Sequence, residues 1–172
     1  MWQSVTGEDR QYYGEKGPDL PACALSWNEC REFCEKLSEL THETIQLPTE
    51  AQWEYACRAD TITPYAGTGY LDDMGWSSGD KYHPVKKKKP NTWGIYDMHG
   101  NVWEWCADWA GKYDMSDLTD PRGAVGGEQK ILRGGSYEAE ASSCRSASRF
   151  ERYPNSQDRD HGFRPVLIPA GE

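Results

Sequence analysis

The sequence has few basic residues, no long apolar run and no signal-peptide pattern. Its 19 lysines and arginines are outnumbered by 28 aspartates and glutamates, which gives a formal net charge of −9. A chain with this excess of negative charge repels phosphate backbones and anionic lipid headgroups, so nucleic acid and membrane surfaces are poor partner candidates. No stretch approaches the roughly 18 apolar residues that a membrane-spanning helix needs. We therefore expect no nucleic-acid binding and no direct membrane insertion by this chain.

The six cysteines form no Cys-x-x-Cys pair. The sequence therefore shows neither a zinc knuckle nor a thioredoxin-type dithiol. Several cysteines follow aromatic residues, as in Phe33-Cys34 and Trp105-Cys106, which is typical of small buried hydrophobic side chains. Buried thiols are the favoured interpretation, and a disulfide framework remains the alternative.

A length of 172 residues is the ordinary size of one domain, and neither an internal repeat nor a linker is apparent. We therefore expect one domain over residues 1–172. The 8 tryptophans and 10 tyrosines, with a mean hydropathy of −0.89, indicate a polar, loop-rich chain held together by a few large rings.

Two capping boxes predict two helices in the first third of the chain. Ser26 with Glu29 begins a helix over about 26–40, and Thr49 with Gln52 begins a second that ends between residues 58 and 60. Glycine and proline then recur every few residues, which predicts short strands and ordered loops. We expect strands at 101–105, 130–133 and 162–168, and a solvated loop or strand edge without function at the lysine run 86–89. This order predicts an α+β domain.

Five sequence blocks resemble the formylglycine-generating-enzyme and sulfatase-modifying-factor family. They are residues 47–56 (LPTEAQWEYA), 93–105 (WGIYDMHGNVWEW), 132–137 (LRGGSY), 144–147 (CRSA) and 162–164 (GFR). The resemblance covers about residues 2–166, with the family's usual first strand missing or upstream. It implies a C-type-lectin-like fold of the formylglycine-generating-enzyme type: two helices with short twisted strands and long ordered loops.

The resemblance also argues against the family's chemistry in this chain. Active members hold copper with two cysteines between the RGGS block and the CR block, whereas residues 137–143 (YEAEASS) contain no thiol. Cys144 matches a cysteine outside that pair, and one thiolate cannot replace a two-sulfur site. A related branch uses iron on clustered histidines, but the four histidines here lie in four separate segments, and His99 is expected to be a hydrogen-bonded structural residue. We expect a protein that is not an enzyme and requires no catalytic cofactor.

The block at 100–104 resembles the stretch that holds calcium in family members. Oxygen atoms from Asn101, from backbone carbonyls such as that of Val102, and from Glu104 would suit a calcium ion with a structural role. The alternative is that Asn101 caps a turn and Glu104 pairs with an arginine such as Arg133.

Between the family blocks, the segment from about 137 to 161 holds an unusual assortment of residues where ordinary members are rich in asparagine. Each can be reached from an asparagine codon by changing its first two bases, both adenines. They are Ser143, Ser148, Phe150, Arg152, Tyr153, Asp158, Asp160 and His161. This pattern resembles the variable proteins of diversity-generating retroelements, most closely those of Treponema. Alternatively, these are merely tolerant loop positions.

The second resemblance implies a receptor-type domain that displays hypervariable residues to a protein or glycan ligand on another surface. It also implies a cell-surface or extracellular location, and we expect a monomer. The variable residues should share one solvent-facing surface, while Cys144, Ala147 and Phe163 face inward. Two alternatives remain: a sulfatase-modifying-factor-type oxidase or maturation enzyme that uses another site, and a structural accessory domain of a longer chain.

Overall fold

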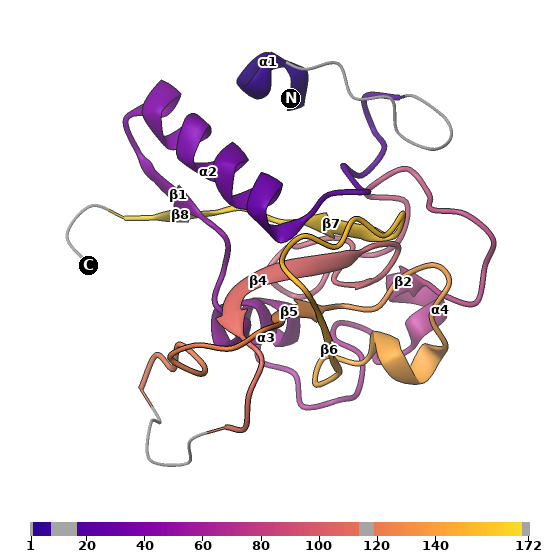
Figure 1. Ribbon diagram of the computed structural model, residues 1–172. Helices are drawn as coiled ribbons and strands as arrows, with labels where there is room; N and C mark the ends of the chain where they lie inside the picture. The colour runs from indigo at the N-terminus through magenta and orange to yellow at the C-terminus, as the bar shows by residue number, and fades with distance from the viewer. Residues whose placement is uncertain (1, 8–16, 114–118, 170–172) are drawn as a thin grey trace.

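The computed structural model describes residues 2–7, 17–113 and 119–169 (Figure 1). Its helices are α1 (Trp2–Thr6), α2 (Trp27–Thr41), α3 (Glu50–Arg58), α4 (Leu71–Met74) and the 3-10 turn η1 (Ala141–Cys144). Its strands are β1 (Thr44–Gln46), β2 (Gly75–Trp76), β3 (His99–Gly100), β4 (Trp103–Trp109), β5 (Lys130–Arg133), β6 (Arg149–Arg152), β7 (His161–Phe163) and β8 (Val166–Ile168). Within these ranges no helix is both long and apolar enough to cross a bilayer.

The main sheet has the order β6-β5-β4-β7. Strand β5 pairs antiparallel with β4 and with β6, whereas β7 pairs parallel with β4. Two small sheets, antiparallel β1-β8 and parallel β2-β3, complete an α+β architecture with long loops. The fold class expected from the sequence is confirmed.

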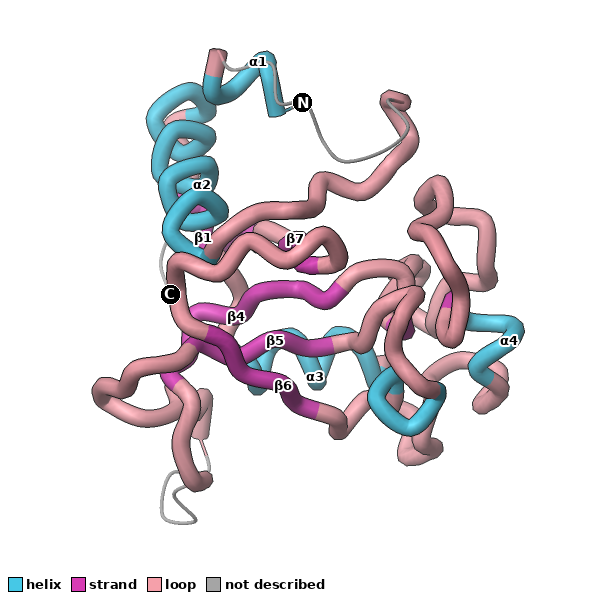
Figure 2. Tube along the Cα trace, turned by 45° about the vertical axis from the view of Figure 1, so that its right-hand side comes forward, coloured by secondary structure: helices cyan, strands magenta, loops and turns pink. Residues whose placement is uncertain are grey.

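The two faces of the main sheet hold different halves of the core, because alternate residues of a strand point to opposite faces. On one face Trp105 and Leu132 pack with Cys30 of α2. On the other, Cys106 and Ile131 pack with residues of α3, which lies behind β5 in Figure 2. The sheet is therefore a two-sided support, with α2 and α3 on opposite sides.

Both predicted helices are present with their predicted caps. Ser26 and Glu29 form the capping box of α2, and Thr49 and Gln52 form that of α3. Helix α3 ends at Arg58 because Ala59 adopts a left-handed conformation with a φ of 43°. Local hydrogen bonds fixed these boundaries, and such bonds depend on neighbouring residues alone.

Two strand predictions need correction. The strand expected at 101–105 is β4, which begins at Trp103, because Asn101 has a φ of 66° and cannot continue a strand. The strand expected at 162–168 is split into β7 and β8, which join different sheets. Between them, Arg164 turns to pair with Glu104, and Pro165 has no amide hydrogen to donate to a neighbouring strand.

Candidate functional site

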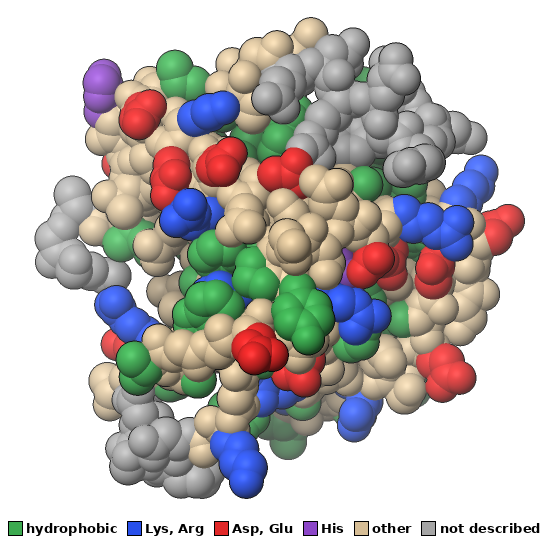
Figure 3. Space-filling model, viewed as in Figure 1, with side chains coloured by type: hydrophobic (Ala, Val, Ile, Leu, Met, Phe, Trp, Pro, Cys, Tyr) green, Lys and Arg blue, Asp and Glu red, His purple; other side chains and the backbone are tan. Residues whose placement is uncertain are grey.

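A groove of about 1130 Å³ lies between η1, β6 and the loop that leads from β6 to β7. Its base includes Trp103 of β4. Seven of the eight residues singled out in the sequence line it, and they are Ser143, Ser148, Phe150, Arg152, Asp158, Asp160 and His161. Figure 3, which looks at the side where β6 lies toward the viewer, shows hydrophobic side chains among charged side chains of both signs.

Stacked aromatic rings form the apolar part of the groove. The Phe150 ring stacks on Trp103 with centroids 5.0 Å apart, and the Arg152 guanidinium carbon lies 4.0 Å from the centre of the Phe150 ring. Arg152 also places its Nε 3.4 Å from a carboxylate oxygen of Asp158. The result is a flat, layered surface that offers both apolar contact and hydrogen-bond donors.

The alternation of β6 explains which of its side chains reach the groove. Phe150 and Arg152 lie on the Trp103 face of the sheet, whereas Arg149 reaches Glu50 at the start of α3. Glu151 does not line the groove. Phe150 and Arg152 are thus the β6 residues on the Trp103 face, and Arg149 also borders the groove.

The expected inward and outward orientations hold only in part. His161 is 1% exposed and presents its edge to Trp105 at 5.3 Å, so the prediction that it faces solvent is wrong. Ala147 is exposed and lines the groove, so the prediction that it faces inward is also wrong. Cys144 is buried, and Phe163 is half-buried.

Tyr153 is exposed but does not line the groove. It follows the last residue of β6, where the chain leaves the sheet. Seven of the eight residues predicted from the sequence therefore line one groove, and Tyr153 lies outside it.

Burial favours the uncharged form of His161. Burial lowers the pKa of its imidazole, while the carboxylates of Asp160 and Asp158 act in the opposite direction. Its Nε2 lies 3.5 Å from Asp158 and 3.7 Å from Asp160. The base of the groove therefore carries a neutral ring next to two acids.

Further groove residues were missed in the sequence. Arg159, which pairs with Glu138, and Gln157, which donates to Glu29, flank Asp158 in the same loop, and that proximity was a usable signal. Trp103 was missed because it lies on β4, far away in sequence. Only the pairing of β4 with β5 and of β5 with β6 brings it to Phe150.

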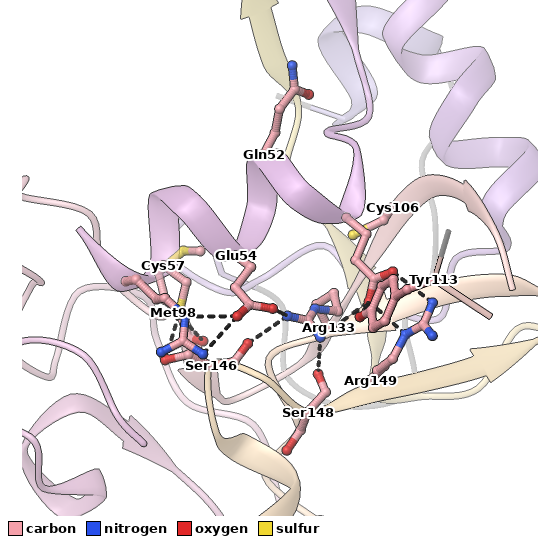
Figure 4. A network of polar contacts seen from close by, with 12 residues as sticks. Gln52, Glu54, Cys57, Met98, Cys106, Tyr113, Arg133, Ser146, Ser148 and Arg149 are labelled. Carbon is pink, nitrogen blue, oxygen red and sulfur yellow. Dashed lines mark hydrogen bonds and ion pairs between the residues drawn. The ribbon is translucent and has the colours of Figure 1, made fainter. Parts of the chain in front are cut away.

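A buried ion network lies behind the groove, on the α3 side of the sheet (Figure 4). Arg133 is fully buried and pairs with Glu54 and with Glu50, the latter at 3.3 Å. Glu50 also accepts two hydrogen bonds of 2.8 Å from Arg149 and one of 3.2 Å from Tyr113. Two guanidinium groups thus share the Glu50 carboxylate away from solvent.

The network also reaches the backbone of residues 144–148. Arg133 donates from Nη2 to the Ser146 carbonyl at 2.6 Å and from Nη1 to the Ser148 carbonyl at 2.7 Å. His99 holds the Cys144 carbonyl at 2.8 Å from Nδ1, while its Nε2 accepts the amide hydrogen of Ala66 at 2.9 Å. The structural role expected for His99 is therefore confirmed.

All six cysteines are buried, and none is in a disulfide. Burial raises the pKa of the Cys144 thiol to about 12 and that of the Cys57 thiol to about 12. A thiol with so high a pKa stays protonated at neutral pH and is a poor nucleophile. The interpretation of the cysteines as small buried side chains is confirmed.

The residues of the calcium prediction have protein partners. The Asn101 side chain accepts from the His83 amide at 2.9 Å and donates to the His83 carbonyl at 3.1 Å. Glu104 accepts from Trp53 and pairs with Arg164 at 2.8 Å, so the arginine suggested in the sequence, Arg133, is not its partner.

Next to them, Val102 is buried. The residues described include no group of three His, Cys, Asp or Glu residues placed to hold a metal. Calcium bound by Asn101, Val102 and Glu104 stays a prediction.

The chain matches the Sulfatase-modifying factor enzyme 1-like domain over residues 1–168. It is 33% identical to the formylglycine-generating enzyme of Streptomyces coelicolor and 30% identical to that of Mus musculus, with 95% of the chain aligned in each case. It spans 57% and 50% of the length of these two relatives.

Among solved structures, Treponema denticola variable protein 1 is similar, with a TM-score of 0.88 and 29% identity over 98% of this chain and 80% of that one. The likeness therefore extends across nearly the whole chain. The sequence match and the shared fold lead to one conclusion: this chain belongs to the family of Sulfatase-modifying factor enzyme 1-like domains.

Proposed function

We propose that this chain is a non-enzymatic, receptor-type domain that binds a ligand in the groove and displays hypervariable residues there. The observation that carries the proposal is the convergence of seven residues reachable from asparagine codons on one groove. Such residues scattered over the surface would indicate tolerant loops, whereas their clustering is what a binding site requires. The similarity to Treponema denticola variable protein 1 supports the same function.

The proposed ligand is a protein or a glycan on another surface, met outside the cell by a monomeric domain. The groove offers a half-buried aromatic ring, forked arginines and adaptable serines, which are the side chains that paratopes and interface hot spots favour. Carboxylates at its rim would select ligands by charge complementarity.

A display selection tests this proposal. One library randomises Ser143, Ser148, Arg152 and Asp158. A matched control library randomises Arg31, Glu32, Glu35 and Lys36, four exposed residues of α2 outside the groove. Both are selected against the same panel of folded proteins and glycans, and we expect specific binders from the groove library at a much higher frequency. Equal frequencies from the two libraries would contradict the proposal.

The curated relatives favour a second candidate, a formylglycine-generating oxidase or a maturation enzyme. The absence of a thiol from residues 137–143 and the buried, protonated Cys144 argue against it. We expect no formylglycine formation on a sulfatase-type cysteine peptide in the presence of copper, measured by mass spectrometry beside the Streptomyces coelicolor enzyme. Copper-dependent product at a comparable rate would establish the oxidase instead. A structural accessory domain would form no formylglycine and would also yield no excess of binders from the groove library.

A further inference from the structure

We infer that His99 and Arg133 are positioning residues that fix the main chain of residues 144–148, so that the groove keeps its shape when the variable side chains change. The inference rests on the proposed function, because it explains how a ligand-binding groove could tolerate changes of side chain. The hydrogen bonds themselves do not depend on any ligand.

The segment is bonded to the rest of the protein through its backbone. The carbonyls of Cys144, Ser146 and Ser148 accept from His99 and Arg133. The Ser146 amide donates to the Pro64 carbonyl at 2.8 Å. Backbone groups are the same for every residue except the proline nitrogen, so these bonds survive a change of side chain.

Arg133 suits this task because its guanidinium is planar and carries several fixed donors. Its two terminal nitrogens bond carbonyls two residues apart, and a single ammonium could not reproduce that fork. Glu50 and Glu54 balance its charge, which permits full burial. The guanidinium therefore lies fixed under the segment and away from the ligand side.

His99 fixes the other end of the segment. The Ala66 amide donates to its Nε2, so Nδ1 carries the ring hydrogen and donates to the Cys144 carbonyl. Burial lowers the pKa of His99, which favours the neutral ring that this arrangement needs. Both nitrogens of one buried ring are thus occupied by backbone groups.

The side chains of the segment divide in the same way. Cys144 and Ser146 are fully buried, whereas Arg145 and Ala147 are exposed and Ser143 and Ser148 are partly exposed. The buried pair belongs to the CRSA block, and the residues at the groove are the ones that can vary without touching the core. Buried side chains therefore hold the backbone from below, and the groove side carries Ser143 and Ser148 together with Arg145 and Ala147 of the family block.

Amide hydrogen exchange measured by NMR on the full chain tests the inference. The substitution Arg133→Lys keeps the charge but removes the fork. We expect the Ser146 and Ser148 amides to exchange on the order of tenfold faster, while the amides of the β4-β5 ladder stay within about twofold. Arg164→Lys is the matched control, because Arg164 also pairs with a buried glutamate and donates to a carbonyl, that of Tyr96, outside the segment.

Faster exchange of the whole sheet, or no change at Ser146 and Ser148, would overturn the inference. If Arg133→Lys does not fold, His99→Gln serves as the second variant, with Ser146 as the reporter and the same ladder as reference. No ligand takes part, so failure here leaves ligand binding by the groove open. Failure of the display selection, in turn, leaves the backbone anchoring intact.

Discussion

The two sides of β5 and β6 carry arginines in opposite circumstances. On the α3 side, Arg133 is fully buried and shares Glu50 with Arg149. On the groove side, Arg152 and Asp158 form a pair at 3.4 Å with about half of each side chain exposed. An exposed pair of this kind contributes about 0–1 kcal/mol, whereas breaking a buried one costs about 3–5 kcal/mol.

The contrast separates what maintains the fold from what could recognise a ligand. Substitutions on the α3 side leave buried charges and backbone groups without partners. Substitutions at the exposed groove positions, such as Asp158, replace one solvated side chain by another. A domain that binds diverse ligands needs both conditions within a few residues of each other, and β6 provides them on its two faces.

Alkaline pH should weaken the core on both faces of the main sheet, because buried thiols lie on both. Burial raises the pKa of Cys23 to about 11 and of Cys34, Cys57 and Cys144 to about 12, from an ordinary 9.0, and raises that of Cys106 well above it. A raised folded-state pKa contributes stability that is complete below about 9 and is lost as the pH rises through the folded values. Between the unfolded and the folded pKa, each thiol lowers the free energy of unfolding by roughly 1.4 kcal/mol per pH unit.

Urea unfolding at pH 8 and pH 10 under a reductant should therefore show a loss of several kcal/mol. Burial lowers the pKa of Lys130 to about 8, which acts in the opposite direction, but it is one group against five. The variant Cys144→Ser should show a smaller difference in unfolding free energy between the two pH values, because it lacks one of the titrating thiols. Equal unfolding free energies at the two pH values would contradict the prediction.

The substitution Glu50→Ala should be the most damaging single change on the α3 side. It leaves Arg133 and Arg149 without a shared carboxylate, so the free energy of unfolding should fall by about 3–5 kcal/mol. Chemical denaturation measures the change. Glu151→Ala is the control, because Glu151 is an exposed acid on β6, and its loss should stay below about 0.5 kcal/mol. Similar losses for the two variants would contradict the assignment of the stability to the buried pairing of Glu50 with Arg133 and Arg149.

The sequence predicted features that depend on neighbouring residues. Helices α2 and α3 were predicted because each capping box spans four residues. The ion pair of Glu50 with Arg149 joins residues 99 positions apart, and no local pattern marks it.

The groove shows the same limit. The codon pattern identified seven of the residues that line it, but it could not show that His161 is buried under Phe150 and against Trp105. Burial depends on the parallel pairing of β7 with β4, which is a tertiary contact. Local rules thus predicted the helices, the family resemblance identified the groove residues, and long-range packing decided the depth of each residue.

Removal of calcium tests whether a metal ion stabilises the turn that contains Asn101 and Glu104. If this turn holds calcium, excess chelator should lower the melting temperature, since a ligand at 100 times its Kd contributes about 2.7 kcal/mol. Calorimetry with chelator and then with calcium restored measures the effect. An unchanged melt would instead support the interpretation in which Asn101 bonds the His83 backbone and Glu104 pairs with Arg164.

The smallest effect is expected on the groove side. Ser143→Asn, Ser148→Asn and Asp158→Asn should each change the free energy of unfolding by less than about 0.5 kcal/mol, because these side chains stay in contact with water. His161→Asn should cost more, about 1–3 kcal/mol, since it replaces a buried ring between Phe150 and Trp105 with a smaller amide that lacks their packing. Chemical denaturation of the four variants separates the groove into an exposed part, where variation is nearly free, and a buried position where stability restricts it. If any of the three exposed variants lowers the free energy of unfolding by more than about 1 kcal/mol, the groove side is also structural, and the two faces of β6 do not differ in their contribution to stability.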